Sequence, residues 1–236
     1  MADEQVRKIV VSCMDRRLHE HIDSKFKDGE TLSLSSAGPS EDSVRSVRKA
    51  VLEHPEVEAV ELLTHEDCGA SGVTYAAKYD YSAYAGMGMS QSVFRRIVDR
   101  YDGMAFRDKE EITQERGRLL RDRVVRAISR VSEAKVTLDH IGLGSIKMPQ
   151  GEGEHSLLLL KPSTAKSSET MDRLGLERFS AYIVQAYNLR DVMPDIEMAL
   201  KAPLHIKKVL ADAGPNGFSG RELASLRRLD VHPVRF

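Results

Sequence analysis

The sequence predicts an α/β fold with a central, mainly parallel β-sheet flanked by helices. Short continuous apolar runs, at residues 9–11 and 157–160, are typical of strands buried on both faces, as in a parallel sheet. Segments with helical spacing of apolar residues alternate with such runs, which is typical of β-α-β units. A chain of 236 residues can bury a sizeable core, so the fold need not depend on disulfides or on a metal.

The first third of the chain predicts three strands, each followed by a loop and a helix. Apolar runs and alternation give the strands, and Gly, Pro or acidic residues mark the helix ends. The predicted order is a strand at 9–11, a helix at 18–27, a strand at 31–35, a helix beginning at Ser40, and a strand at 57–63. Ligands of such sheets bind outside the carboxyl ends of the strands, where the segments after residues 11 and 63 would meet.

The remaining chain predicts more helix than strand. The expected elements are a helix within 72–89 that runs into a loop, amphipathic helices over 93–101 and 119–131, strands at 136–138 and 157–160, and a mostly helical tail that includes 179–187 and 196–209. We therefore expect a domain over 1–162 with a helical insertion at 71–130. Residues 163–236 are expected to form a helical C-terminal extension packed on the same domain.

Charge and cysteine content narrow the classes of partner. The 35 basic and 36 acidic residues give a net charge of -1, which favours neither nucleic acid nor a membrane surface as a partner. Charges interrupt every apolar run near the N-terminus, so neither a secretory leader nor a membrane span is expected. With only two cysteines, far apart in sequence, we expect no disulfide framework and a reducing, cytoplasmic location.

Cys13, His65 and Cys68 form the candidate metal site. Zinc prefers tetrahedral coordination by thiolate and imidazole, and catalytic sites keep three protein ligands with a fourth position open. His65 and Cys68 are three residues apart, so one turn of backbone can direct both at one ion, while Cys13 follows a neighbouring predicted strand. An H-x-x-C pair alone is weak evidence, because a buried, unreactive cysteine is common. The only two cysteines of the chain, however, both fall where a metal site would need them.

The full pattern reads C-M-D-R-R from Cys13, A-G at Ala37-Gly38, and H-E-D-C-G from His65, each after a predicted strand. This pattern resembles the β-class carbonic anhydrases, which carry C-x-D-x-R after the first strand and H-x-x-C-G after the third. The resemblance covers about residues 7 to 75. It implies a β-carbonic anhydrase-like fold, one zinc ion per chain and the reversible hydration of carbon dioxide to bicarbonate by zinc-bound hydroxide.

The resemblance also implies roles for neighbouring residues. Asp15 pairs with Arg17 and orients the zinc-bound water, or in some members moves in as a fourth ligand. The family's enzymes are dimers whose protomers meet through helices and edge strands, so a homodimer or higher homo-oligomer is expected. The aromatic stretch at 75–84 is a candidate contact surface.

One departure from the family pattern concerns the substrate neighbourhood, which we assign to Ser36, Ala37, Gly38 and Gly69. The family often has Arg-Asn before its Ala-Gly, whereas this chain has Ser35-Ser36. The Ser36 hydroxyl and the Gly38 backbone are expected to donate to a bound anion or water. Relatives of the fold hydrolyse carbon disulfide or carbonyl sulfide with the same zinc site, and a non-catalytic, zinc-stabilised binding protein is a third reading; the motif does not separate the three.

Other candidate sites are weaker. Glu66 and Asp67 are interpreted as caps of the following helix. His19 and His21 lie on a predicted helix beside the first motif, and a solvated face is the preferred interpretation over a proton-shuttling role. The stretch Gly142-Leu143-Gly144-Ser145 lacks the third glycine of a dinucleotide fingerprint and is read as a turn.

Overall fold

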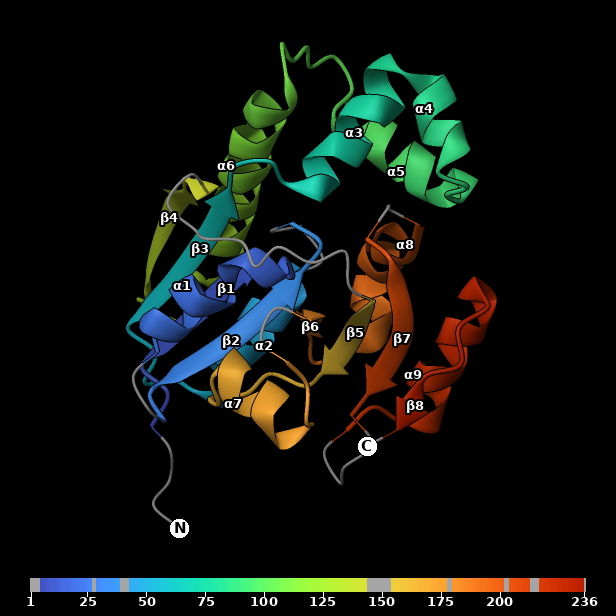
Figure 1. The fold of residues 1–236 in the computed structure, drawn as a ribbon. Coiled ribbons are helices and arrows are strands. Elements are labelled where there is room, and N and C mark those ends of the chain that lie inside the picture. Colours follow the sequence, from blue (N-terminus) through green and yellow to red (C-terminus); the bar gives the residue numbers. More distant parts are fainter. Residues whose placement is uncertain are drawn as a thin grey trace.

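The computed structural model has a single eight-stranded sheet with helices on both faces (Figure 1). It describes residues 5–26, 29–38, 43–143, 154–177, 180–201, 204–212 and 217–235. All neighbouring strands run parallel except the central pair β2 and β6, which is antiparallel. The predicted α/β class with a mainly parallel sheet is confirmed.

The strands follow the order β4-β3-β1-β2-β6-β5-β7-β8 across the sheet. Their bounds are β1 Lys8–Cys13, β2 Thr31–Ser36, β3 Ala59–His65, β4 Lys135–Ile141, β5 His155–Leu160, β6 Ala181–Gln185, β7 Ile206–Ala211 and β8 Val234–Arg235. The N-terminal half of the chain therefore contributes β1 to β4, and the C-terminal half contributes β5 to β8. The two halves meet where β2 pairs with β6.

The helices connect the strands and cover the sheet. Their bounds are α1 His19–Ser24, α2 Ser43–Glu53, α3 Gly69–Tyr79, α4 Tyr81–Gly86, α5 Gln91–Arg100, α6 Lys109–Ile128, α7 Ser167–Arg173, α8 Met193–Lys201 and α9 Gly220–Ala224, with short 3-10 turns η1 Arg16–Leu18, η3 Leu189–Val192 and η4 Ser225–Leu229. In the part of the chain that the structure describes, no helix combines the length and apolarity that a bilayer crossing needs.

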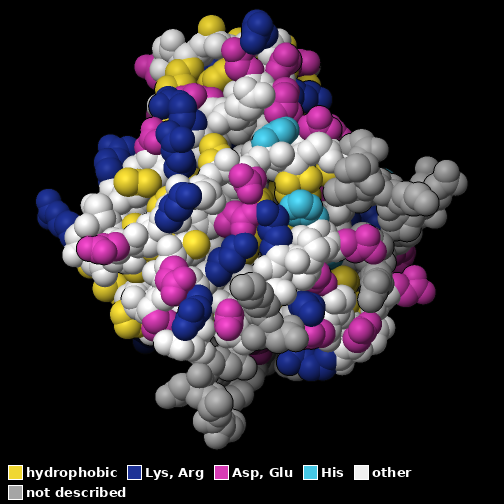
Figure 2. Space-filling view, turned by 90° about the vertical axis from the view of Figure 1, so that its left-hand side faces the viewer, with side chains coloured by type: hydrophobic (Ala, Val, Ile, Leu, Met, Phe, Trp, Pro, Cys, Tyr) yellow, Lys and Arg dark blue, Asp and Glu magenta, His cyan; other side chains and the backbone are white. Residues whose placement is uncertain are grey.

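Side-chain alternation along the strands divides the core between the two faces. Ile9 and Val11 pack with the apolar sides of α2 and α6, while Val10 points to the opposite face and packs near Leu18 and Ile22. The β1 burial pattern is continuous because helices cover both faces, as expected for a parallel strand. On the molecular face seen in Figure 2, basic and acidic side chains are interspersed, in keeping with the near-zero net charge.

The prediction of a mostly helical segment over 163–236 holds for α7, α8 and α9 but is wrong at two places. Residues 181–185 form β6 and residues 206–211 form β7, where helices were expected. The apolar residues of β6 form a short continuous run, which does not distinguish a buried strand from a buried helix. Strand β7 has the exposed residues Lys207 and Lys208 near its start, and its apolar residues are too few to show a strand period. The predicted helix start at Ser40, and Gly144-Ser145 of the predicted turn, lie outside the described residues.

Candidate metal centre

Three separate backbone segments bring Cys13, His65 and Cys68 together. Strand β1 ends at Cys13 and its parallel neighbour β3 ends at His65, so both side chains emerge at the same edge of the sheet. Cys68 follows as the N-cap of α3. The sulfur atoms and a ring nitrogen of His65 all lie within 4.8 Å of one another, and all three residues are buried. They form a possible metal site.

The imidazole of His65 is oriented for a ligand on one nitrogen. Its Nδ1 lies 2.7 Å from the backbone oxygen of Glu66, so Nδ1 carries the proton and donates it to that carbonyl. The Nε2 atom is buried and has no hydrogen-bond partner among the described residues. A buried polar atom without a partner is costly, and metal-binding histidines typically donate their other N–H to a carbonyl in this way. The donor set therefore fits a metal ion.

The two thiols are held beside this nitrogen. The Gly38 N–H donates to Cys13 Sγ at 3.2 Å, which stabilises negative charge on the sulfur. Hydrogen bonding with the Cys13 thiol lowers the pKa of Cys68, and His65 and Arg116 lower it further. The same hydrogen bond, together with burial, raises the pKa of Cys13. Thiolate is the form that binds metal, and two thiolates with one imidazole are ligands that zinc prefers.

Asp15 and Arg17 form a bidentate ion pair next to the donors. Arg17 Nε lies 3.0 Å from both carboxylate oxygens, and Arg17 Nη2 lies 2.6 Å from Asp15 Oδ2. That oxygen is 4.0 Å from His65 Nε2. Burial would raise the pKa of Asp15, but the hydrogen bonds and charge of Arg17 outweigh it and leave the pKa below its ordinary value. The carboxylate is therefore ionised at neutral pH and lies close to the His65 nitrogen that would bind a metal ion.

Asp67 holds Arg17 from the other side. Arg17 Nη1 lies 3.3 Å from Asp67 Oδ2, and Nη2 donates to the Asp67 backbone oxygen at 3.0 Å. Glu66 accepts a hydrogen bond from the Leu143 N–H at 2.9 Å. The interpretation of these two acids as helix caps is wrong, because Cys68 is the N-cap of α3 and no side chain caps that helix. They instead connect the H-E-D-C loop to Arg17 and to the end of β4.

Arg116 is a buried residue of the site that sequence reasoning missed. Its guanidinium donates to the Ala37 backbone oxygen at 3.1 Å and to Thr74 Oγ1 at 3.2 Å. A Cβ atom on Gly38 would lie 3.0 Å from Arg116 Nη2 and 3.3 Å from Cys68 Sγ, and the Gly38 φ angle is +68°. The signal was present: Arg116 occupies the buried face of α6, four residues before Leu120, where the pattern calls for an apolar side chain.

The remaining predicted residues have other environments. The Ser36 hydroxyl donates to the Gly38 backbone oxygen at 2.9 Å and lies 3.0 Å from Ser43 Oγ, so its hydrogen-bonding capacity is used within the chain. His19 is buried rather than solvated, and burial lowers its pKa to about 4. The interpretation of His19 as part of a solvated face is therefore wrong.

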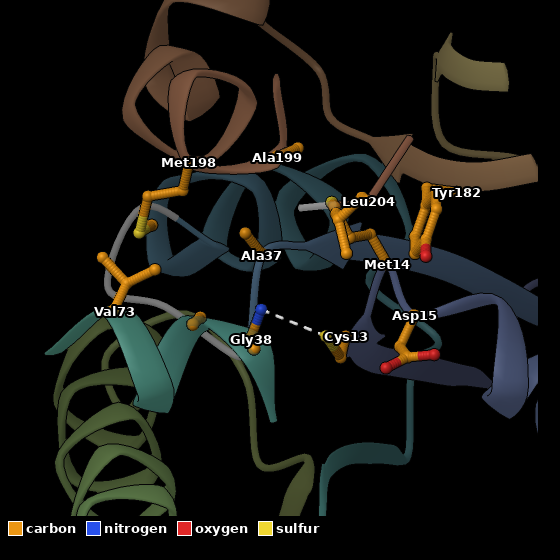
Figure 3. A pocket seen from close by; sticks show the side chains of 12 residues that line it. Cys13, Met14, Asp15, Ala37, Gly38, Val73, Tyr182, Met198, Ala199 and Leu204 are labelled. Atoms are coloured by element: carbon orange, nitrogen blue, oxygen red, sulfur yellow. Dashed lines mark hydrogen bonds between the residues drawn. The ribbon is translucent and has the colours of Figure 1, made fainter. Parts of the chain in front are cut away.

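A small cavity of about 50 Å³ is lined by Cys13, one of the three donors, and by Asp15 (Figure 3). Cys13, Asp15, Ala37, Gly38 and Gly69 line it from the N-terminal half. The opposite wall comes from the C-terminal half and consists of Tyr182, Met198, Ala199 and Leu204. Most of the lining is apolar, with Asp15 as its charged group. Because a single water needs about 10–15 Å³ of such volume, the cavity holds only molecules of a few atoms.

Comparison with known proteins gave structural similarity without sequence matches. No family model and no curated protein matches the sequence. The structure is similar to a carbonic anhydrase from Glaciozyma antarctica (18% identity, TM-score 0.41, covering 61% of this chain and 81% of the other). It is also similar to β-carbonic anhydrase isoform I of Trichomonas vaginalis (18% identity, TM-score 0.41, covering 62% of this chain and 82% of the other). A third similar structure is the β-carbonic anhydrase CafA of Aspergillus fumigatus (14% identity, TM-score 0.37, covering 72% of this chain and 81% of the other). At these values no activity follows from the similarity, and the function has to be argued from the site itself.

Proposed function

We propose that this protein is a zinc-dependent enzyme that hydrates carbon dioxide reversibly to bicarbonate. The observation that carries the proposal is the buried Nε2 of His65, which has no hydrogen-bond partner among the described residues and lies close to two thiols and to Asp15. Cys13 and Asp15 in turn line a small, mostly apolar cavity. Cys13, His65 and Cys68 would hold one zinc ion per chain. When bound, zinc would lower the pKa of water at its open position toward about 7 and so supply a nucleophile at neutral pH.

Asp15 would orient the attacking water. Its carboxylate cannot rotate freely, because Arg17 donates hydrogen bonds to both oxygens and also donates one to Asp67. An ionised carboxylate only accepts hydrogen bonds, so it selects the orientation in which the water's proton points at Asp15 and its lone pair at the cavity. We assign Asp15 as the orienting group and Arg17 as the residue that positions it.

The cavity would select the substrate by size and polarity. About 50 Å³ accommodates a linear triatomic molecule, and apolar walls favour an uncharged one. Gly38 N–H already donates to Cys13, and the Ser36 hydroxyl donates to Gly38, so neither is available to a substrate in this arrangement. Gly69 and Ala37 leave space close to the donors because their side chains are small or absent.

Carbonyl sulfide or carbon disulfide hydrolysis is the second candidate reaction. The same apolar wall of Met198 and Leu204 favours it, since both molecules are uncharged and triatomic. A non-catalytic metal-binding role is the third reading. Both would use the same zinc ligands, so substrate assays have to separate the three.

The test combines metal analysis with stopped-flow hydration of carbon dioxide on one reduced sample. We expect about one zinc per chain and hydration that Asp15→Asn lowers about 10–100-fold without loss of zinc. Asp99→Asn, on the exposed face of α5, is the matched control and should change neither quantity. Zinc without hydration, but with release of sulfide from carbonyl sulfide or carbon disulfide, would replace the first reaction by the second. A zinc-loaded protein inactive on all three substrates would contradict an enzymatic role, and a metal-free protein would contradict the zinc site.

Two further properties belong to this proposal. Unprotected thiol ligands suit a reducing compartment, which is why we propose a cytoplasmic location. The predicted homodimer stays a prediction: β2 is paired with β6 of the same chain, which leaves β4 and β8 as the outer edge strands. Tyr79 and Tyr81, from the stretch proposed as a contact surface, are about half exposed.

A further inference from the structure

The two halves of the chain repeat one arrangement of strands and helices. Counted outward from the central β2–β6 pair, the strands of the N-terminal half follow the order β2, β1, β3, β4, and those of the C-terminal half the order β6, β5, β7, β8. In both halves the second strand in sequence is therefore innermost, followed by the first, the third and the fourth. The connecting helices follow suit. Helix α1 between β1 and β2 corresponds to α7 between β5 and β6, and α2 between β2 and β3 corresponds to α8 between β6 and β7. Antiparallel pairing at the centre relates the halves by a twofold rotation.

Contacts across the junction agree with this relation. The Ser33 N–H donates to the Ser163 backbone oxygen at 3.0 Å, and reciprocally the Ile183 N–H donates to the Met14 backbone oxygen at 3.3 Å. In each case a residue of the second strand of one half reaches the segment that follows the first strand of the other. Helices α1 and α7 also meet, where Asp23 accepts hydrogen bonds from the N–H groups of Ser167 and Ser168 at 2.7 and 3.0 Å.

The register identifies which residue replaces the first metal ligand. Ser35 pairs with Gln185 across the junction; Ser12 is the β1 partner of Ser35, and Leu160 is the β5 partner of Gln185. Ser12 therefore corresponds to Leu160, and the next residue, Cys13, corresponds to Lys161.

Lys161 places an ammonium group where the first half has a metal-binding thiol. Its Nζ donates to the Tyr187 backbone oxygen, lies 3.5 Å from Glu222 Oε1, and sits 4.4 Å from the centre of the Phe218 ring. Both cysteines of the sequence lie in the first half. The second half thus has a fixed positive charge but not the ligands for a second ion.

We propose that the C-terminal half is a degenerate internal copy that has lost the metal site and acts as a built-in partner, closing the cavity over the remaining one. Met198 and Tyr182, which face Cys13 and Asp15 across the cavity, then set the size of molecule that reaches the donors. The assignment of these two residues as specificity determinants rests on the proposed function, because it takes the cavity as the substrate's route.

The two thiols report access without any need for turnover. In metal-free protein, Cys13 and Cys68 are treated with methyl methanethiosulfonate or with benzyl methanethiosulfonate. Each thiolate that reacts forms a mixed disulfide and releases methanesulfinate, and the reaction is followed by mass spectrometry. Met198→Ala should speed the reaction with the benzyl reagent at least tenfold and with the methyl reagent less than twofold. Met171→Ala, a buried methionine of α7 outside the cavity, is the matched control and should show no such selectivity.

Equal rates for Met198→Ala and Met171→Ala would overturn the assignment of the wall. Cobalt(II) titration of the same proteins keeps this result separate from the proposed function. A thiolate-to-cobalt charge-transfer absorption that saturates at one cobalt ion per chain supports the metal site, whether or not the two thiol reagents differ in rate. Two ions per chain would overturn the loss of the second site. Size-selective disulfide formation in a protein that binds no cobalt would overturn the proposed function and leave the assignment of the wall in place.

A different observation, a groove lined by arginines, carries a second inference. Two adjoining cavities of about 660 and 550 Å³ share Arg96 of α5 and Arg190 of η3. The first also has Arg45, Arg123 and Arg126 along its wall. Its acid is Asp191, which accepts a hydrogen bond from Arg45 at 3.1 Å. In a chain of net charge -1, five guanidinium groups from four elements around one hollow are not explained by overall basicity.

The adjoining cavity has a different character. Val93, Met193, Pro194 and Leu229 give it an apolar wall. Its polar lining residues include Arg228 and Glu197, whose carboxylate accepts hydrogen bonds from the N–H and the hydroxyl of Ser90. We infer that the groove binds an organic phosphate, with the phosphate groups on the arginines and the organic body against the apolar wall. Arginine pairs with phosphate through two parallel hydrogen bonds, and both cavities have the volume of small-molecule sites.

Calorimetric titration at constant ionic strength tests this inference with ADP, pyrophosphate and adenosine. ADP should bind more tightly than pyrophosphate, and adenosine should not bind measurably. Arg96→Gln and Arg190→Gln should each weaken ADP binding at least tenfold. Arg121→Gln, on the exposed side of α6 outside the groove, should leave it within twofold. Equal effects of all three variants, or binding of polyglutamate in the absence of ADP binding, would overturn the inference.

Discussion

Replacement of Gly38 by alanine tests whether the close approach of backbone, thiols and guanidinium builds the site. Gly38 has a φ angle of +68°, and a Cβ atom there would lie 3.0 Å from Arg116 Nη2, 3.2 Å from Ala70 Cβ and 3.3 Å from Cys68 Sγ. The left-handed conformation costs an alanine about 1–2 kcal/mol. Overpacking in a rigid environment adds about 1–3 kcal/mol. The free energy of unfolding should therefore fall by about 2–5 kcal/mol.

Two other glycines separate these contributions. Gly175 also has a positive φ, +63°, but its Cβ would meet nothing within 4 Å, so Gly175→Ala should cost only the conformational part. Gly69 has neither a positive φ nor a close neighbour and lies in the first turn of α3, so Gly69→Ala should be neutral or slightly stabilising. Urea denaturation of the three metal-free variants gives the free energies from the midpoints and slopes.

The same variants carry a second readout at the metal. Gly38→Ala pushes against Cys68 Sγ and removes no ligand, so it should weaken cobalt binding, whereas Gly175→Ala should not. If Gly38→Ala and Gly175→Ala lose equal stability and bind cobalt equally well, the crowding argument is wrong and Gly38 is required for its backbone conformation alone.

Three further predictions follow from other groups. Burial lowers the pKa of His19 to about 4, below its unfolded value of about 6.5. The neutral ring therefore contributes up to about 3 kcal/mol to the free energy of unfolding above pH 6.5, and this contribution is lost as the pH falls toward 4. Urea denaturation at pH 4.5 and 7.5 should show a smaller pH dependence of stability for His19→Leu than for the unchanged protein. Arg116→Met should cost about 2–4 kcal/mol by leaving the Ala37 oxygen and Thr74 hydroxyl without their donor, against less than about 0.5 for the exposed Arg118→Met. Light scattering should give a dimer that Tyr79→Ser with Tyr81→Ser weakens; a monomer at high concentration would contradict the homodimer.

Local patterns were sufficient to predict the first half of the fold and its candidate site. Parallel neighbours such as β1 and β3 place their carboxyl ends at one edge, so residues just after them can be paired without knowing the rest of the chain. Cys13 and His65 were assigned by that rule, and the structure places their donor atoms within reach of one ion. The Asp15–Arg17 pair was equally accessible, since the two residues are neighbours within one turn.

Interactions between distant segments were not accessible in this way. Arg116 reaches the site from a helix more than forty residues after Cys68, and only its charge in an apolar stripe marked it. Strand β6 was missed because a short strand that is buried on both faces cannot be distinguished from a buried helix by its apolar run. Strand β7 has two exposed lysines near its start, so its sequence shows neither a continuous apolar run nor strict alternation. The second half repeats the topology of the first without its motifs, and a repeat that exists only in strand order leaves no sequence period to detect.

Lys161 indicates why one half could lose a metal without losing the fold. In the first half a dication would neutralise two thiolates at the end of β1, and removal of the ligands alone would leave nearby carbonyl and carboxylate oxygens without a cation. The ammonium of Lys161 occupies the corresponding strand end, bound to the Tyr187 oxygen and beside Glu222, whose pKa its charge helps to lower. A fixed cation thus replaces the electrostatic role of an ion while offering no open coordination position. The proposed chemistry would then be confined to the half that keeps Cys13, His65 and Cys68, while the other half contributes Tyr182 and Met198 to the cavity beside Cys13.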